Sequence, residues 1–266
     1  MLMKSKNYNI NGKQIGYFDC GKGKVIVLLH GYLETKEVWI DFAEKLSINF
    51  RVIAIDIPGH GKSEVFSEIH SMELMATVVN KLLTELNIDK CNIVGHSMGG
   101  YVMLAFAELF PERVEKIVLF HSSVYADAPE KKGNRLNDIK LINSGKLSEI
   151  VDNHIPKTFA NDNTVLFKNE INKMKYFGKQ NNPSGVIALV KGMMQRKDKQ
   201  EFIKNYKFPL CFIFGKKDNF ISVDVATNMI QLNDKTETVW LSDSGHMGFI
   251  EEKEKSLQTI LNFITL

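Results

Sequence analysis

The sequence has 266 residues, which is enough for one large domain whose hydrophobic core needs no disulfide or metal. Hydrophobic residues make up 44% and charged residues 24% of the chain, as is typical of a globular protein, and the formal net charge is only +3. The densest basic cluster, QRKDKQ at 195–200, is interrupted by an aspartate, whereas nucleic-acid-binding proteins carry longer basic stripes. The composition therefore argues against a nucleic-acid partner.

The sequence also carries signals about the cellular compartment. The first 13 residues lack the apolar core of a signal peptide, and no apolar run is long enough to cross a bilayer. Cys20, Cys91 and Cys211 form no CxxC motif, and two of them lie in apolar runs, so we expect buried thiols in a reducing compartment. We therefore predict a cytoplasmic protein without membrane insertion.

Short apolar runs alternate with longer helical patterns along most of the chain. A first pair, QIGYFDCG (14–21) and KVIVLLHG (24–31), predicts a hairpin across residues 21–24. Later runs end in Gly, Asp, Ser or His, as strands buried on both faces of a parallel sheet often do: RVIAIDIPG (51–59), CNIVGHS (91–97), VEKIVLFHS (114–122), LCFIFGKKD (210–218) and TVWLSDSG (238–245). Helical patterns cover about 37–46, 71–86, 99–109, 223–232 and 252–263. This alternation predicts an α/β doubly wound sheet.

The stretch 122–207 interrupts the alternation. It holds no convincing buried strand but several amphipathic helical pieces, among them RLNDIKLI (135–142) and GVIALVKGMM (185–194). Strands resume at residue 208. We therefore expect a core made of 1–121 and 208–266, and a helical cap made of 122–207 that lies over one end of the sheet.

The segment IVGHSMGGYVML (93–104) places one serine between glycines, after an apolar run and before a helical pattern. Gly95, Ser97 and Gly99 match the G-x-S-x-G nucleophile elbow, where a strand turns sharply into a helix and glycines avoid a clash. Such a turn presents the hydroxyl at the carboxyl edge of the sheet and at a helix N-terminus. We therefore predict that Ser97 is a nucleophile.

A serine nucleophile needs a general base, and the chain has seven histidines. His246 follows the last predicted strand and precedes the last predicted helix, so we expect it where the strand-end loops converge. Structural roles are the simpler interpretation for five others, which lie in turns, in the approach to a helix or in the insertion: His30, His60, His70, His96 and His154. We predict His246 as the base.

The third member of a triad is an acid between the serine and the histidine. Asp218 comes just after a buried strand, whereas Asp224 lies where the next helix begins and Asp243 is better explained as a turn cap. The order Ser97, Asp218, His246 is that of the Ser-Asp-His triads in proteins with a nucleophile elbow.

Two further sets of residues complete the predicted site. The backbone N–H of Met98, directly after the nucleophile, and that of Tyr32, in the loop after the strand at 24–31, are the expected oxyanion donors, with Leu33 as a less favoured alternative to Tyr32. Met174, Met193 and Met194 are candidates for lining an adaptable apolar substrate pocket, although each also fits an ordinary helix core.

With these residues in place, the chain resembles the α/β-hydrolase superfamily over nearly its whole length. The motifs that carry the resemblance are HGY at 30, DIPGHGKS at 56, GHSMGG at 95, GKKD at 215 and SGHM at 244. The resemblance implies an eight-stranded, mostly parallel sheet with one reversed strand and a helical cap after the sixth strand.

Departures from particular branches narrow the resemblance. Ser97 stands where haloalkane dehalogenases and epoxide hydrolases of this fold carry aspartate, and Tyr101 where the menaquinone-pathway synthase typically has an arginine. The loop HGYLET (30–35) lacks the glycine richness usual in hydrolases that cleave carbon–carbon bonds of dienoates. Met98 replaces the tryptophan usual in proline iminopeptidases.

These features together favour a serine hydrolase that cleaves a small ester or thioester through an acyl-enzyme. This mechanism needs no cofactor and no metal, and its partner is a small-molecule substrate. Three alternatives stay open: a receptor or signalling protein that keeps the triad, a lyase resembling the menaquinone-pathway synthase, and perhydrolysis by the same triad, because a fold does not determine its chemistry.

Overall fold

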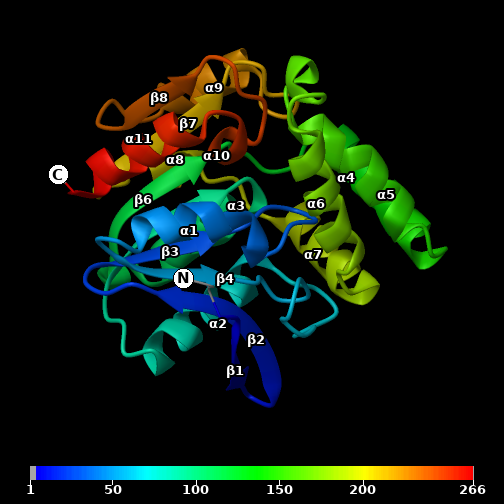
Figure 1. Cartoon of the computed structure of the whole chain (residues 1–266), viewed down its shortest axis with the longest axis horizontal. Helices are drawn as coiled ribbons and strands as arrows, with labels where there is room; N and C mark the ends of the chain where they lie inside the picture. Colours follow the sequence, from blue (N-terminus) through cyan, green and yellow to red (C-terminus); the bar gives the residue numbers. More distant parts are fainter. Residues whose placement is uncertain (1–3, 266) are drawn as a thin grey trace.

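The computed structural model describes residues 4–265, which form an eight-stranded sheet with helices on both faces (Figure 1). The strands in chain order are β1 (Lys6–Ile10), β2 (Lys13–Cys20), β3 (Val25–Leu29), β4 (Arg51–Ile55), β5 (Cys91–His96), β6 (Val114–Phe120), β7 (Leu210–Gly215) and β8 (Glu237–Leu241). Across the sheet their order is β1-β2-β4-β3-β5-β6-β7-β8. β2 is antiparallel to both of its neighbours, β1 and β4, and the strands from β4 to β8 in this order are parallel. The predicted mostly parallel sheet with one reversed strand is confirmed.

The first predicted hairpin is wrong. β2 pairs with β1 and β4, while β3 lies between β4 and β5. The observed hairpin joins β1 and β2 through Asn11 and Gly12, which both have positive φ (53° and 84°), as a tight turn between antiparallel strands requires. Since β3 is almost entirely apolar, it belongs in the middle of the sheet, where both of its faces are covered.

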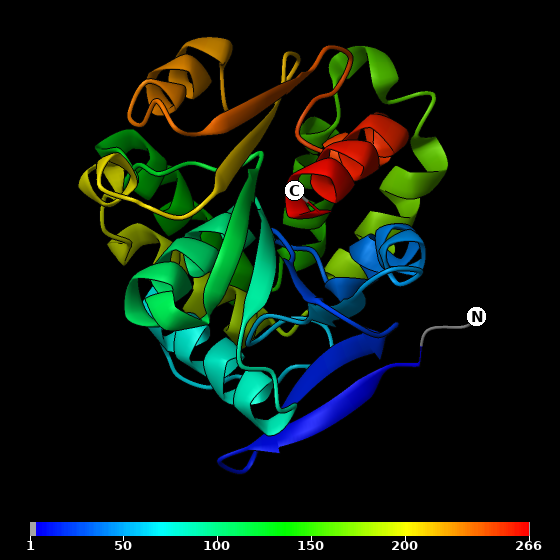
Figure 2. The ribbon, with the colours of Figure 1, turned by 90° about the vertical axis from the view of Figure 1, so that its left-hand side faces the viewer.

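Helices cover both faces of the sheet, and for this reason every residue of β5 and β7 is buried. Figure 2 shows α1 and α11 on one side and α2 and α3 on the other. The helices of the core are η1 (Lys36–Trp39), α1 (Ile40–Leu46), α2 (Met72–Glu85), α3 (Met98–Leu109), η2 (Pro111–Arg113), α9 (Val223–Ile230), α10 (Gly248–Glu251) and α11 (Lys253–Thr265). No helix within residues 4–265 is both long and apolar enough to span a membrane.

The segment between β6 and β7 is helical in the structure. Figure 1 shows α4 to α7 grouped together on the right of the view, beside the core. The segment contains α4 (Pro129–Asn143), α5 (Leu147–His154), η3 (Ile155–Thr158), η4 (Asn161–Asn163), α6 (Lys168–Lys179), α7 (Pro183–Gln195) and α8 (Gln200–Lys204). The helical insertion after the sixth strand thus agrees with the expectation, while the domain limits at 122 and 207 stay predictions.

A buried ion pair anchors the loops that follow β3 and β4. The side chains of Asp56 and Lys36 are both fully buried, and Lys36 Nζ lies 2.8 Å from Asp56 Oδ2. Asp56 also accepts hydrogen bonds from the backbone N–H groups of Lys36 (2.8 Å) and Lys62 (2.9 Å). The DIPGHGKS motif is therefore held by its own aspartate.

We predict that Asp56→Asn lowers the free energy of unfolding by about 3 kcal/mol, because it leaves the buried ammonium of Lys36 without its main partner. The value lies at the low end for a broken buried pair because Lys36 also contacts Glu37 at 2.9 Å. Urea unfolding at pH 7 measures it. The control Asp41→Asn removes an exposed pair with Lys253 and should cost less than about 1 kcal/mol. Equal losses in the two variants would contradict the prediction.

Candidate active site

Ser97 occupies a strained turn between β5 and α3. Its backbone has φ 49° and ψ −116°, a conformation that non-glycine residues rarely adopt and that costs about 1–3 kcal/mol. Two hydrogen bonds hold the turn: Ser97 N–H donates to Phe120 O (2.9 Å), and Ser122 Oγ donates to Ser97 O (2.6 Å). Both partners lie at the end of β6, so the neighbouring strand stabilises the elbow.

The glycines of the elbow are required by close packing. A Cβ on Gly95 would lie 2.6 Å from the Cα of Gly100, and a Cβ on Gly99 would lie 2.4 Å from the carbonyl oxygen of Leu29. Backbone atoms cannot move away as a flexible side chain can. The G-x-S-x-G spacing is therefore a packing requirement of this strand–turn–helix unit.

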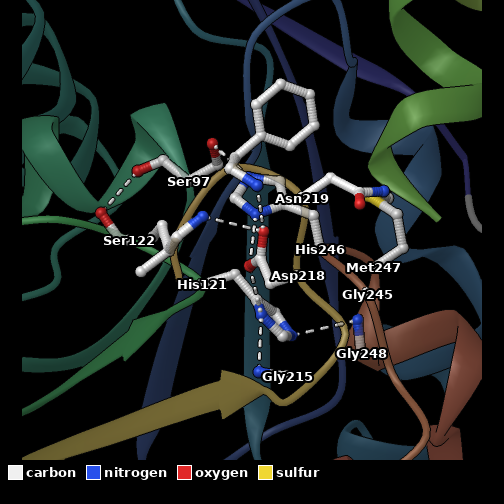
Figure 3. A network of polar contacts seen from close by, with 12 residues as sticks. Ser97, His121, Ser122, Gly215, Asp218, Asn219, Gly245, His246, Met247 and Gly248 are labelled. Carbon is white, nitrogen blue, oxygen red and sulfur yellow. Dashed lines mark hydrogen bonds and ion pairs between the residues drawn. The ribbon is translucent and has the colours of Figure 1, made fainter. Parts of the chain in front are cut away.

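The three predicted triad residues come together at the carboxyl edge of the sheet (Figure 3). His246 Nε2 lies 2.8 Å from Ser97 Oγ, and His246 Nδ1 lies 2.8 Å from Asp218 Oδ2. Asp218 follows β7, and His246 lies between β8 and α10. The distances fit a relay in which Nδ1–H donates to the carboxylate and Nε2 accepts from the serine hydroxyl.

Asp218 is an almost fully buried carboxylate that accepts hydrogen bonds at both oxygens. Its Oδ1 accepts from the backbone N–H groups of Phe220 (2.7 Å) and Ile221 (3.1 Å). Burial alone would raise the pKa of Asp218, but the charge of His246 and hydrogen bonds from His121 and His246 outweigh burial and hold the pKa well below its usual range. Asp218 is therefore ionised at neutral pH.

His121 is a site residue that the sequence analysis missed. It follows β6, and its Nδ1 lies 3.2 Å from Asp218 Oδ2, the oxygen that also faces His246. Burial lowers the pKa of His121 to about 4, so its imidazole is neutral at neutral pH. Its place after an apolar strand was a usable signal, because Asp218 was identified by the same position.

His121, Asp218 and His246 also have the atom types of a metal site, with one ligand atom from each lying within 4.8 Å of the others. The two N···O separations, 3.2 and 2.8 Å, are those of hydrogen bonds from imidazole N–H groups to a carboxylate. A proton on each Nδ1 explains the arrangement, so we assign the cluster to the triad and its support.

A buried pair lies directly beneath the triad. His96 Nδ1 is 3.1 Å from Glu34 Oε2, and His96 Nε2 is 2.8 Å from the carbonyl oxygen of His246. Burial alone would lower the pKa of His96, but the charge and hydrogen bond of Glu34 outweigh it and raise the pKa. Glu34 also accepts the N–H of Gly31 (2.7 Å). The pair thus links the loop after β3 to the loop that carries His246.

Both predicted oxyanion donors line the cavity that contains Ser97, which has a volume of about 250 Å³. Met98 is the first residue of α3, so its N–H has no acceptor within that helix. The N–H of Tyr32 donates to no protein atom within residues 4–265. The alternative donor, Leu33, has a left-handed backbone (φ 61°), which makes this loop turn tightly.

The three methionine candidates lie in different places. Met193 lines the cavity beside Ser97 and His246. Met174 lines a separate cavity between η1, α6 and α10, and Met194 packs half-buried against the core. The helices of the insertion therefore bring only Met193 of the three to the nucleophile, because Met174 and Met194 face other neighbours.

The residues set aside as structural occupy such positions. His30 Nε2 accepts the N–H of Ile57 (3.0 Å) and braces the loop after β4. Asp224 lies in the first turn of α9, as expected. Asp243 pairs with Lys217 at 3.3 Å, and within residues 4–265 its side chain forms no hydrogen bond that would cap the turn, so its predicted cap is not observed. His154 differs from expectation, because it lines the cavity that contains Ser97.

We predict that Glu34→Gln lowers the free energy of unfolding by about 3 kcal/mol at pH 6, because protonated His96 loses its buried partner. A pKa raised by folding contributes stability below the ordinary histidine value near 6.5, and this stability is lost as the pH rises through the raised pKa of His96. The deficit should therefore be smaller at pH 9 than at pH 6 in urea unfolding. The exposed pair of Glu149 and Lys146 supplies the control Glu149→Gln, with a small change at either pH. A deficit that grows with pH would contradict the assignment.

Comparisons with known proteins agree with this geometry. The sequence profile of a family described as the alpha/beta hydrolase fold matches residues 24–253. The chain is 27% identical over 267 residues to 2-hydroxy-6-oxononadienedioate/2-hydroxy-6-oxononatrienedioate hydrolase 1 of Pseudomonas putida, covering 94% of this chain and 92% of that protein. The corresponding hydrolase of Escherichia coli K12 is also 27% identical, with coverage of 94% and 91%.

Two solved structures extend the comparison. A thermophilic esterase from Thermogutta terrifontis, solved with malate bound, superposes with a TM-score of 0.92 at 26% identity and covers 98% of both chains. The enol-lactonase from Burkholderia xenovorans LB400 has a TM-score of 0.91 at 22% identity, covers 98% of this chain and 100% of that one, and supports the fold alone. With this profile match, this sheet topology and this elbow, the chain belongs to the α/β-hydrolase family.

Proposed function

We propose that this protein is a serine hydrolase that cleaves a small ester through an acyl-enzyme. The observation that supports it best is the continuous relay Ser97–His246–Asp218, with 2.8 Å between each pair of donor and acceptor atoms. Such a relay raises the nucleophilicity of a hydroxyl that is otherwise protonated and weak. Hydrolytic relatives that align over nearly the whole chain support the reaction class.

The chemical steps follow from the geometry. Ser97 Oγ attacks the acyl carbonyl carbon while its proton passes to His246 Nε2, and Asp218 stabilises the imidazolium through Nδ1–H. The N–H groups of Met98 and Tyr32 stabilise the negative oxygen of the tetrahedral intermediate. His246 then protonates the leaving alcohol, and a water activated by the same imidazole hydrolyses the acyl-enzyme.

Cleavage of a carbon–carbon bond is the second candidate. The curated relatives from Pseudomonas putida and Escherichia coli are named as hydrolases of 2-hydroxy-6-oxononadienedioate, and they match 94% of this chain. The glycine-poor HGYLET loop argues against carbon–carbon cleavage, but the similarity to these relatives is a reason to test this reaction as well. Ester cleavage remains the first candidate, because the esterase from Thermogutta terrifontis superposes closely over 98% of the chain.

We predict that Ser97→Ala lowers kcat/KM for p-nitrophenyl butyrate by about 10³-fold or more, because within residues 4–265 His246 is hydrogen-bonded to no other hydroxyl. The rate of p-nitrophenolate release from purified protein measures this. The matched control is Ser123→Ala, because Ser123 lines a different cavity from Ser97 and, within residues 4–265, its hydroxyl accepts a hydrogen bond only from the N–H of Tyr125 (3.1 Å).

Three outcomes separate the alternatives in that experiment. Equal turnover by a folded Ser97→Ala variant would contradict the mechanism. Labelling of Ser97 by a fluorophosphonate without multiple turnover would favour a triad-bearing receptor. Turnover of 2-hydroxy-6-oxononadienedioate can be measured by the loss of its conjugated absorbance. If the protein turns over this compound faster than any ester in a chain-length series, carbon–carbon cleavage is the main reaction.

We further infer that the substrate carries a carboxylate. Helix α4 turns four polar residues toward the cavity at positions i, i+3, i+4 and i+7, namely Lys131, Asn134, Arg135 and Asp138. This spacing places them on one helix face. An amphipathic helix normally directs an apolar face inward, so a polar face over the nucleophile indicates a polar ligand.

The electrostatics of this wall favour an anion. Arg135 and Arg196 both pair with the buried carboxylate of Asp127, which leaves one positive charge in excess. Burial alone would raise the pKa of Tyr101, but the charges of Arg196, Lys131 and Arg135 outweigh it and lower the pKa. Lys131 and Asp138, which also line the cavity, carry opposite charges, so the formal net charge of this wall is +1. The relatives act on a dioate or were solved with malate, and both of these compounds carry carboxylates.

We predict that Arg135→Gln raises KM for monomethyl glutarate about tenfold but leaves methyl pentanoate, the uncharged analogue, nearly unchanged. Acid release in a pH-stat measures both reactions. Lys131→Gln should act in the same direction by a few-fold, since its side chain is more exposed, whereas the adjacent Lys132→Gln, which does not line the cavity, should have no effect. A preference for methyl pentanoate in the unmodified protein would exclude the carboxylate site.

A further inference from the structure

We propose that His121 is a positioning residue that holds the Asp218 carboxylate in line with His246 and weakens its attraction for the proton of His246. The proposal rests on the proposed hydrolase function and extends the relay by one group. His121 contacts Asp218 Oδ2 through Nδ1 (3.2 Å) and receives the backbone N–H of Gly248 at Nε2 (3.2 Å), as Figure 3 shows.

The tautomer of His121 follows from its hydrogen bonds. With the proton on Nδ1, the ring donates to Asp218 and accepts the N–H of Gly248, and only the N–H of Gly215 loses its acceptor on this ring. With the proton on Nε2, the ring accepts only the N–H of Gly215, which lies 3.2 Å from Nδ1, and sets a lone pair against the carboxylate. Two satisfied contacts outweigh one, so Nδ1 carries the proton and donates to Asp218.

The backbone of His121 is strained, which indicates that its contact with Asp218 is functional. Within residues 4–265, five non-glycine residues have positive φ; two are asparagines in turns, and the others are Leu33, Ser97 and His121 (φ 45°). Leu33 and Ser97 belong to the oxyanion loop and the nucleophile elbow. Strain of this kind persists where the surroundings enforce it and gathers at functional sites. His121 is thus held in the same way as the nucleophile.

Within residues 4–265, Asp218 is the only carboxylate that His121 contacts. Its ring is stacked on Phe120 with centroids 5.0 Å apart. The other titratable groups that face it are His246 and His96, with ring centroids at 5.6 and 6.2 Å. Because Asp218 Oδ2 accepts from both His121 and His246, a bond from His121 disperses the negative charge that would otherwise attract the proton of His246.

A pair of substitutions at residue 121 tests the proposal. His121→Gly removes the donor and tolerates positive φ, whereas His121→Asn also tolerates positive φ and places a side-chain N–H near the former Nδ1. We expect His121→Gly to lower kcat by about tenfold with little change in KM. Titration of Ser97 with a fluorophosphonate counts the active sites, so that kcat refers to active protein alone. The acid limb of the pH–kcat/KM profile of His121→Gly should move up by about half a pH unit. In His121→Asn, both kcat and the position of the acid limb should return most of the way to those of the unmodified protein.

Further measurements separate this role from simple structural support. The control His70→Asn changes a buried histidine whose Nε2 accepts the N–H of Phe66 (3.1 Å) and which, within residues 4–265, forms no hydrogen bond with a triad residue, so any effect on folding should leave the acid limb in place. NMR of the histidine ring nitrogens without substrate reports which nitrogen of His121 carries the proton and at what pH His246 takes up its second proton, even if no ester is cleaved. An unprotonated Nδ1 in the unmodified protein, an unchanged acid limb in folded His121→Gly, or no rescue by His121→Asn would overturn the proposal.

Discussion

The buried negative charge of Asp218 is the constraint on which the rest of the site depends. A carboxylate excluded from water is stable only when hydrogen-bond donors surround it, and the backbone N–H groups of Phe220 and Ile221 and the imidazoles of His121 and His246 do so. These donors come from the ends of β6, β7 and β8. The site is thus assembled only when these strands are in register, so the sheet and the relay form as one unit.

A second layer of buried charges connects the loops around this centre. Glu34 and His96 link the loop after β3 to the backbone of His246, and Lys36 and Asp56 link that loop to the one after β4. Buried pairs of this kind add little net stability, but each fixes a geometry because either partner alone would be costly. The insertion supplies the opposite wall, where α4 brings positive charge over the nucleophile. The strand ends of the core thus hold the predicted triad, and α4 of the insertion lines the opposite side of the same cavity.

Sequence patterns predicted the residues whose role depends on local geometry or on position after a strand. Gly95, Ser97 and Gly99 form one short turn, and Asp218 and His246 each follow an apolar run, so all could be identified without long-range contacts. The first hairpin was misassigned because the apolar character of β3 does not reveal its neighbours in the sheet, although Asn11-Gly12 was a usable turn signal. Met174 and Met194 could not be separated from Met193, because helical periodicity identifies a face but not what covers it.

The sequence by itself determined the fold class and located the glycine-flanked turn that carries Ser97, because strand periodicity and such a turn are properties of neighbouring residues. Only the tertiary structure decided that His121 contacts Asp218, that Glu34 pairs with His96, and that a polar face of α4 lines the cavity. His121 and Asp218 are 97 positions apart in the sequence, and Glu34 and His96 are 62 positions apart. Their partners depend on strand order and helix packing, which many distant interactions establish together and which no local pattern encodes.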